Sequence, residues 1–216
     1  MSLSRAGAIA AFVCAGTYIF GFAILGLVIA PAGAMPGATE IEPYVAFLVE
    51  NRGLMSLWYL VIYVVNAIFL SALVVALSEV LRPANPGLAQ VAKAFGLIWA
   101  TLVFGAGMLV NVGLADVVKL YPVSPGEAVS LWRIVEMIEN GIGGGNEIAG
   151  AVWALCLGLG AWMGGAFSRA WAGLSIVIGL AGLSTVIPAL SEIGGAIFGL
   201  GYIVWFIWTG LGLLKA

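Results

Sequence analysis

Residues 6–30 read AGAIAAFVCAGTYIFGFAILGLVIA and contain no charged side chain. A helix needs about 20 apolar residues to cross the hydrocarbon core of a bilayer, and this stretch is 25 residues long. The apolar region of a cleavable signal peptide is usually about 7 to 15 residues long. We therefore expect residues 6–30 to form an uncleaved first transmembrane helix.

The whole chain shares this apolar character. Of its 216 residues, 63% are hydrophobic and 8% are charged. A soluble domain usually carries roughly 25% charged residues, so the composition excludes a separate soluble domain. The sequence predicts a single transmembrane domain over residues 1–216.

Charged and turn-forming residues divide the chain into six long apolar segments. The expected spans cover residues 6–30, 54–81, 94–115, 141–163, 171–187 and 189–214. Arg82-Pro83 closes the second span and Asn85-Pro86 starts the next helix, because proline is tolerated in a first helical turn and not inside a helix. The predicted fold class is an all-α polytopic integral membrane helix bundle of about six transmembrane helices.

A helix that starts at Pro125 is expected to be one additional, interfacial amphipathic helix. Ser124, Pro125 and Glu127 have the spacing of a capping box with proline at the first helical position. After this start, apolar and charged side chains fall on different faces, as in a helix that lies on a membrane surface. A second short surface helix is expected within residues 41–49.

The distribution of lysine and arginine predicts the orientation. If both termini share one side of a six-span bundle, five cations lie on that side and three on the other: Arg5, Arg82, Lys93, Arg169 and Lys215 against Arg52, Lys119 and Arg133. Cytoplasmic loops carry the excess of positive charge. We expect a multi-pass protein of the cell inner (cytoplasmic) membrane with both termini cytoplasmic.

Several classes of function are disfavoured. The chain has no histidine, which is a common ligand of haem, copper and catalytic zinc, and it has no phosphate-binding loop, dinucleotide fingerprint or Cys-x-x-Cys motif. Its net charge is −2 and its cations are scattered, which disfavours nucleic acid as a partner. Cys14 and Cys156 lie in apolar runs and are expected to be buried thiols. We expect no cofactor and no metal, and favour a non-enzymatic protein over an enzyme.

The segment from Glu139 to Glu147, ENGIGGGNE, is the strongest candidate for a functional site. Each glycine inside a helix costs about 1 kcal/mol relative to alanine, so four glycines in five positions favour a broken helix. Backbone groups freed inside a membrane must face protein or a water-filled cavity. Asn146 and Glu147 follow directly, and a carboxylate inside a span is a functional candidate.

Three further polar residues complete the predicted ligand-binding set. Glu192 belongs to the same outer half of the membrane as Glu147 in the six-span topology, and Asn111 lies at a similar depth. Arg133 is the expected counter-charge. Each has a structural alternative: Glu192 can complement a helix dipole, Asn111 can join two helices, and Arg133 can pair with Glu136 on an exposed face.

Two segments carry a resemblance to a known group. Residues 140–153, with their glycines and Glu147, and residues 199–208, GLGYIVWFIW, resemble the uncharacterised bacterial six-span membrane proteins known as domain of unknown function 4386. The similarity extends over most of the chain. It implies a bacterial six-helix membrane fold and no particular activity.

Our leading hypothesis is a protein that binds or conducts a small or amphiphilic ligand at a polar site in the outer half of the membrane. The alternative is an accessory or assembly subunit of a larger membrane complex, which the small soluble mass and the 31 glycines also suit. A lipid-modifying enzyme that uses a carboxylate as its base is a third hypothesis. The expected partners are the lipid bilayer, the ligand, and further copies of the chain or other subunits.

Overall fold

The computed structural model describes residues 2–37, 40–144, 147–164 and 167–215. These residues form helices and no strand, which confirms the predicted all-α fold class. Five stretches are long and apolar enough to cross a membrane: Leu3–Ala32, Arg52–Leu81, Pro86–Leu120, Pro125–Trp162 and Ser191–Leu213. The chain therefore has the architecture of a multi-pass membrane protein.

The first two stretches are long helices that contain irregular turns. Helix α1 (Leu3–Ile24) continues through a π-helical turn, η1 (Leu25–Ile29), and a 3-10 turn, η2 (Ala30–Ala32). After the short helix α2 (Glu42–Glu50), α3 (Arg52–Tyr59) continues through the π-helical turn η3 (Leu60–Val65) into α4 (Asn66–Leu81). The π-helical turn η3 becomes important below, because it carries two residues of the candidate site.

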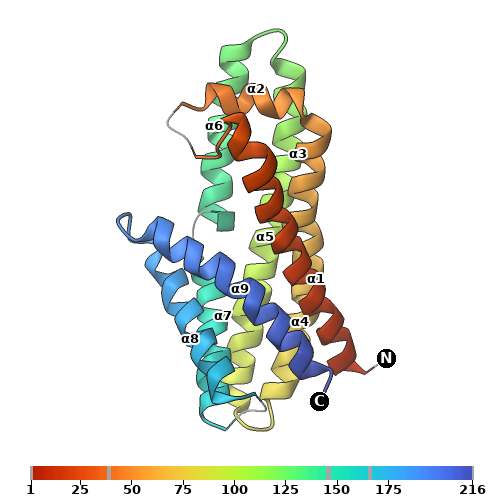
Figure 1. Cartoon of the computed structure of the whole chain (residues 1–216), viewed down its shortest axis with the longest axis vertical. Helices are drawn as coiled ribbons and strands as arrows, with labels where there is room; N and C mark the ends of the chain where they lie inside the picture. Colours follow the sequence, from red (N-terminus) through yellow and green to blue (C-terminus); the bar gives the residue numbers. More distant parts are fainter. Residues whose placement is uncertain (1, 38–39, 145–146, 165–166, 216) are drawn as a thin grey trace.

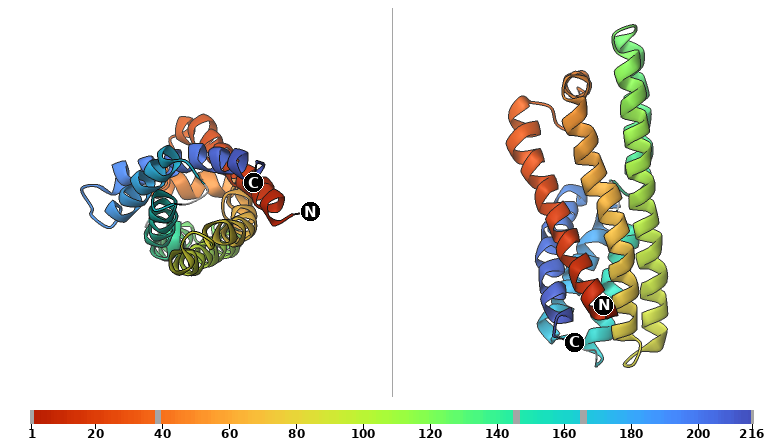
Figure 2. Two further views of the ribbon diagram at one scale, coloured as in Figure 1. Left: turned by 90° about the horizontal axis from the view of Figure 1, so that it is seen from below. Right: turned by 90° about the vertical axis from the view of Figure 1, so that its right-hand side faces the viewer.

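The longest helix is α5 (Pro86–Leu120), with 35 residues. At 1.5 Å per residue it extends about 52 Å, and Figure 2 shows it rising beyond the other helices. It begins as predicted, because the side chain of Asn85 accepts a hydrogen bond of 3.1 Å from the backbone N–H of Leu88.

The next stretch is a helix broken near its middle into α6 (Pro125–Glu139), the turn η4 (Asn140–Gly144) and α7 (Ile148–Trp162). Helix α6, which was predicted to be interfacial, runs lengthwise beside α5, where Val135 lies against Gly113; Ile142 of η4 lies near Gly105. Its start at Pro125 is as predicted. The capping box is not formed, since the side chain of Ser124 makes no capping hydrogen bond.

The last two helices are α8 (Arg169–Ser184) and α9 (Ser191–Leu213). With 16 residues, α8 is about 24 Å long, which is shorter than a hydrocarbon core of about 30 Å. The described residues therefore contain five helical stretches of spanning length and one shorter apolar helix. Helices α7, α8 and α9 occupy the half of the bundle that holds both chain termini (Figure 1).

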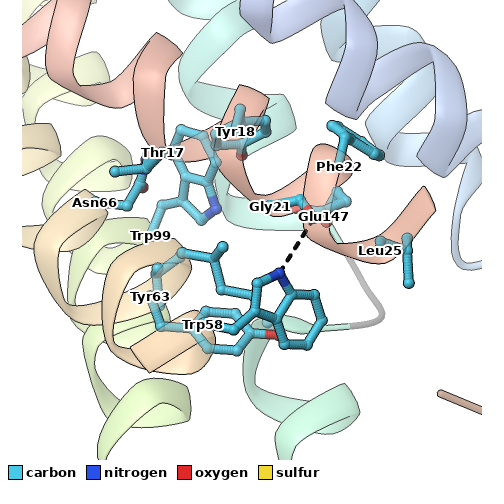
Figure 3. A pocket seen from close by; sticks show the side chains of 13 residues that line it. Thr17, Tyr18, Gly21, Phe22, Leu25, Trp58, Tyr63, Asn66, Trp99 and Glu147 are labelled. Atoms are coloured by element: carbon cyan, nitrogen blue, oxygen red, sulfur yellow. Dashed lines mark hydrogen bonds between the residues drawn. The ribbon is translucent and has the colours of Figure 1, made fainter. Parts of the chain in front are cut away.

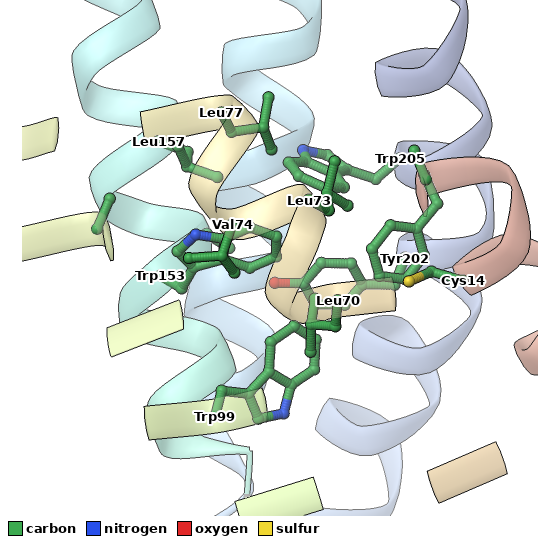
Figure 4. Close-up of a cluster of buried hydrophobic side chains, with 14 of the residues drawn as sticks. Cys14, Leu70, Leu73, Val74, Leu77, Trp99, Trp153, Leu157, Tyr202 and Trp205 are labelled. Carbon is green, nitrogen blue, oxygen red and sulfur yellow. The ribbon is translucent and has the colours of Figure 1, made fainter. Parts of the chain in front are cut away.

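Two hydrophobic cores hold the bundle together. Seen from the end that holds the termini, the helices form a ring (Figure 2), and its interior is filled by aromatic side chains. Figure 4 shows Trp99, Trp153, Tyr202 and Trp205 in this first core, where the hydroxyl of Tyr202 donates to the carbonyl of Gly150 at 3.0 Å. The second core joins α2 and α6 to the far ends of the longer helices.

Both cysteines behave as predicted. Cys14 and Cys156 are free and buried, and each lies in the first core.

Candidate functional site

The predicted helix break between Glu139 and Glu147 is present. Gly143 has φ +140°, a conformation that side chains with a Cβ rarely adopt, and it interrupts the helical geometry of η4. Helix α7 then begins at Ile148, after Glu147. The glycine run therefore separates two helices in the middle of the molecule.

Glu147 is fixed by its backbone, which leaves its carboxylate available. Its N–H donates a hydrogen bond of 3.1 Å to the hydroxyl of Thr185 at the end of α8, and its carbonyl accepts from the N–H of Ala151 at 2.8 Å. Within the described residues, no hydrogen bond or ion pair engages its side-chain oxygens. A carboxylate that the protein leaves unsatisfied is a ready acceptor for a ligand.

Glu147 lines a cavity of about 290 Å³, which we call the Glu147 cavity (Figure 3). It lies between α1, the segment α3–η3–α4, α5 and the break between α6 and α7. Its walls are mostly apolar or aromatic: Thr17, Tyr18, Gly21, Phe22, Leu25, Trp58, Ile62, Tyr63, Asn66, Trp99, Val103, Gly143 and Glu147. Ligand sites in proteins have this character of an apolar pocket with a few polar groups.

Two donors in this cavity also lack a protein partner. Trp99 is 2% exposed, and its indole nitrogen faces the middle of the cavity without a hydrogen-bond acceptor among the described residues. The hydroxyl of Tyr18 likewise has no hydrogen bond within the described part of the chain. By contrast, the amide of Asn66 donates to Thr17 at 2.7 Å and the indole of Trp58 donates to the carbonyl of Gly21 at 3.1 Å.

Close packing at two glycines positions the side chains of η3. A Cβ at Gly21 would lie 2.8 Å from a methyl of Ile62, and a Cβ at Gly107 would lie 2.6 Å from the Cβ of Tyr63. Only glycine allows α1 and α5 to approach η3 this closely from two sides. π-helical turns are frequent at functional sites, and this one carries Ile62 and Tyr63 into the cavity wall.

A second cavity of about 270 Å³ adjoins the first, and the two share the side chains of Trp58 and Tyr63. We call it the Glu139 cavity, because the buried carboxylate of Glu139 lies in its wall and accepts a hydrogen bond from the hydroxyl of Tyr63. It is lined by Pro36, Gly37, Trp58, Tyr59, Tyr63, Val110, Trp132, Glu136, Glu139 and Asn140.

Behind this second cavity, Tyr44 on α2 braces α3. Its hydroxyl lies 2.7 Å from that of Tyr59, and burial raises the pKa of Tyr44 above its ordinary value. The two neutral hydroxyls therefore form a hydrogen bond that holds Tyr59 in the wall of the cavity.

Of the five predicted site residues, Glu147 lines a cavity and Asn146 lies outside the described residues. Glu192 is exposed in the first turn of α9, and Asn111 donates a hydrogen bond of 2.8 Å to the carbonyl of Gly107 one turn earlier in α5. Neither Glu192 nor Asn111 lines the Glu147 cavity. The expected grouping of these residues around Glu147 is therefore not what the fold produces.

Arg133 also has a different partner from those expected. Its guanidinium lies 3.4 Å from the carboxylate of Glu42, at an exposed contact between α6 and α2. Glu136, the alternative partner, instead accepts a hydrogen bond of 2.9 Å from the N–H of Gly37. Arg133 thus joins two helices and faces neither cavity.

Sequence reasoning missed several residues of the two cavities. Trp58, Tyr63 and Tyr18 come from helices whose pairing is not visible in the sequence pattern. Glu139 is the first residue of the glycine-rich segment 139–147, and this position is the sequence feature that could have indicated it as a site residue. In the described part of the chain, no three Cys, Asp or Glu side chains gather as they would around a metal ion.

Comparison of the chain with protein-family models, with curated proteins and with solved structures finds no match. The resemblance to the six-span bacterial group therefore stays a prediction.

Proposed function

We propose that this chain is a multi-pass membrane protein that binds a small amphiphilic molecule in the Glu147 cavity. The observation that carries the proposal is a set of polar groups that have no hydrogen-bond partner among the described residues, in a mostly apolar cavity: the carboxylate of Glu147, the indole N–H of Trp99 and the hydroxyl of Tyr18. These groups line the cavity and keep free hydrogen-bonding capacity there, so a ligand can be their partner.

The chemistry of the walls indicates the chemistry of the ligand. A hydroxyl-bearing head can donate to Glu147 and accept from Trp99, and a short hydrocarbon chain fits against Phe22, Leu25 and Ile62. The volume of about 290 Å³ is near the lower limit of ordinary ligand pockets. A monoacylglycerol has both parts, and we take this class as the probe.

The location of the cavity supports a ligand that comes from the membrane. Its lining belongs to four of the five stretches of spanning length. Leu25 and Trp58 lie towards the ends of their stretches that are far from the chain termini. With the termini cytoplasmic, as the lysine and arginine distribution favours, the proposed site belongs to the outer half of a bacterial inner membrane.

The proposal can be tested with a monoacylglycerol that carries a photoreactive diazirine in its acyl chain. The purified protein in a mild detergent is irradiated with the probe, and the modified peptides are identified by mass spectrometry. We expect adducts on peptides containing Phe22, Leu25 or Ile62, and a lower yield in Glu147→Gln.

The matched control is Glu192→Gln, which removes an exposed carboxylate outside the cavity and should leave the yield unchanged. Adducts confined to the outer faces of the bundle, or an undiminished yield in Glu147→Gln, would contradict the proposal. Chemical turnover of the probe by the purified protein would instead favour the enzyme hypothesis.

A further inference from the structure

The Glu139 cavity adjoins the site of the proposed function and shares Trp58 and Tyr63 with it, but it has its own chemistry. It lies between the loop after η2, the α3–η3 segment, α5 and α6. Its volume of about 270 Å³ is close to that of its neighbour. Its lining differs, because two carboxylates and four aromatic rings meet there.

The two carboxylates give the cavity a negative charge that no ion pair among the described residues balances. Glu139 is 8% exposed and is bonded by the hydroxyl of Tyr63, and Glu136 is bonded by the N–H of Gly37. The ion pairs among the described residues engage neither side chain, since Arg133 is held by Glu42. A carboxylate has roughly four acceptor sites, so both retain the capacity to bind a cation.

The aromatic rings form a wall that suits an organic cation. The ring centres of Tyr59 and Tyr63 are 6.2 Å apart with nearly parallel planes, and the ring centre of Tyr59 is 6.1 Å from that of Trp132 and 5.0 Å from that of Trp58. Aromatic faces attract ammonium groups, and cages of such rings bind quaternary ammonium ions. Trp132 is 1% exposed, and its indole nitrogen has no hydrogen-bond partner within the described residues.

We propose that the Glu139 cavity is a second binding site, for an organic cation of the quaternary or alkylated ammonium class. The aromatic rings contact the alkyl groups, and Glu136 and Glu139 supply the opposite charge. An inorganic cation would be attracted by the carboxylates but has no alkyl groups to pack against the rings. A neutral amphiphile would pack against the rings but would not be attracted by the carboxylates.

The test compares choline with 3,3-dimethylbutan-1-ol, which has the same shape and no charge. Binding of each to the full chain in a non-ionic detergent is measured by isothermal titration calorimetry. We expect choline to bind at least about tenfold more tightly than the neutral alcohol, because only choline gains the carboxylate and cation–π attraction.

The variants Glu139→Gln and Glu136→Gln should each weaken choline binding, about tenfold for the more deeply buried Glu139. Glu127→Gln, an exposed acid in the first turn of the same helix, is the matched control and should bind as the wild type does. Equal binding of the two probes, no binding of choline, or unchanged binding in both cavity variants would overturn the inference.

A Glu147→Gln variant distinguishes this site from the first one. Choline binding that survives Glu147→Gln places the cation in the Glu139 cavity. If Glu147→Gln abolishes choline binding while Glu136→Gln and Glu139→Gln do not, the cation binds in the Glu147 cavity, and the second site is overturned. Failure of the monoacylglycerol experiment leaves the choline result unaffected, because the two probes report on different carboxylates.

Discussion

At the scale of single residues, two glutamates with similar sequence surroundings differ in what the fold does with them. Glu147 and Glu192 each lie at the start of an apolar helix, and each was a candidate ligand-binding residue. Glu147 lines a cavity, whereas Glu192 is exposed in the first turn of α9. The difference comes from the helices that surround each position, so the sequence alone could not separate them.

Asn66 gives a prediction at the same scale. Its buried amide donates to Thr17 and joins α4 to α1, so Asn66→Ala should lower the free energy of unfolding by about 0.5–1 kcal/mol, the usual value for a hydrogen bond between membrane helices. The measurement is reversible unfolding in mixed detergent micelles.

Asn111→Ala is the control for this variant. Among the described residues, the amide of Asn111 bonds to a carbonyl one turn earlier in its own helix and to no other group, so its loss should have a smaller effect. Equal losses in the two variants would show that the contact between α1 and α4 contributes nothing specific.

At the scale of helices, one irregularity was predictable and another was not. The run of glycines after Asn140 predicted the break between α6 and α7, because glycine disfavours a continuous helix. The π-helical turn η3 has the sequence LVIYVV, which contains neither glycine nor proline. The close contacts of this turn with Gly21 and Gly107 are tertiary, and a local pattern does not contain them.

The break gives a second prediction. Gly143→Ala should destabilise the protein by about 1–2 kcal/mol, because φ +140° is strained for any residue with a Cβ. The same variant should weaken ligand binding, since Gly143 lines the Glu147 cavity. Unfolding in mixed micelles and the photolabelling yield measure the two effects.

Gly141→Ala is the matched control, two residues earlier in the same turn. A Cβ at Gly141 would meet no atom within 4 Å, and its φ is not in the left-handed region. This variant should be neutral or slightly stabilising. A Gly143→Ala protein as stable as Gly141→Ala would contradict the strained conformation at the break.

At the scale of the whole molecule, composition and apolar length were enough to predict an all-α membrane bundle. The cavity beside α6 was not predictable from the sequence, for a physical reason. An amphipathic helix has the same pattern whether its polar face meets water at a membrane surface or an internal cavity, and Glu136 and Glu139 face a cavity. The site depends on which helices are neighbours, which the periodicity of one helix does not specify.

The whole-molecule prediction concerns topology. Both termini lie at the same end of the bundle (Figure 1), and the lysine and arginine distribution favours a cytoplasmic position for that end. A fluorescent protein that folds only in the cytoplasm should be bright when fused to either terminus, and alkaline phosphatase should be inactive at both. Opposite results at the two termini would contradict this arrangement.

The most direct test of the central claim is native mass spectrometry of the protein purified in a mild detergent, wild type beside Glu147→Gln. A ligand held by the Glu147 cavity predicts that the wild type retains one small amphiphilic molecule and that Glu147→Gln loses it while keeping its fold. The same molecule retained equally by both proteins would contradict the role of Glu147. A wild type that carries no small molecule but a fixed partner protein would favour an accessory subunit instead.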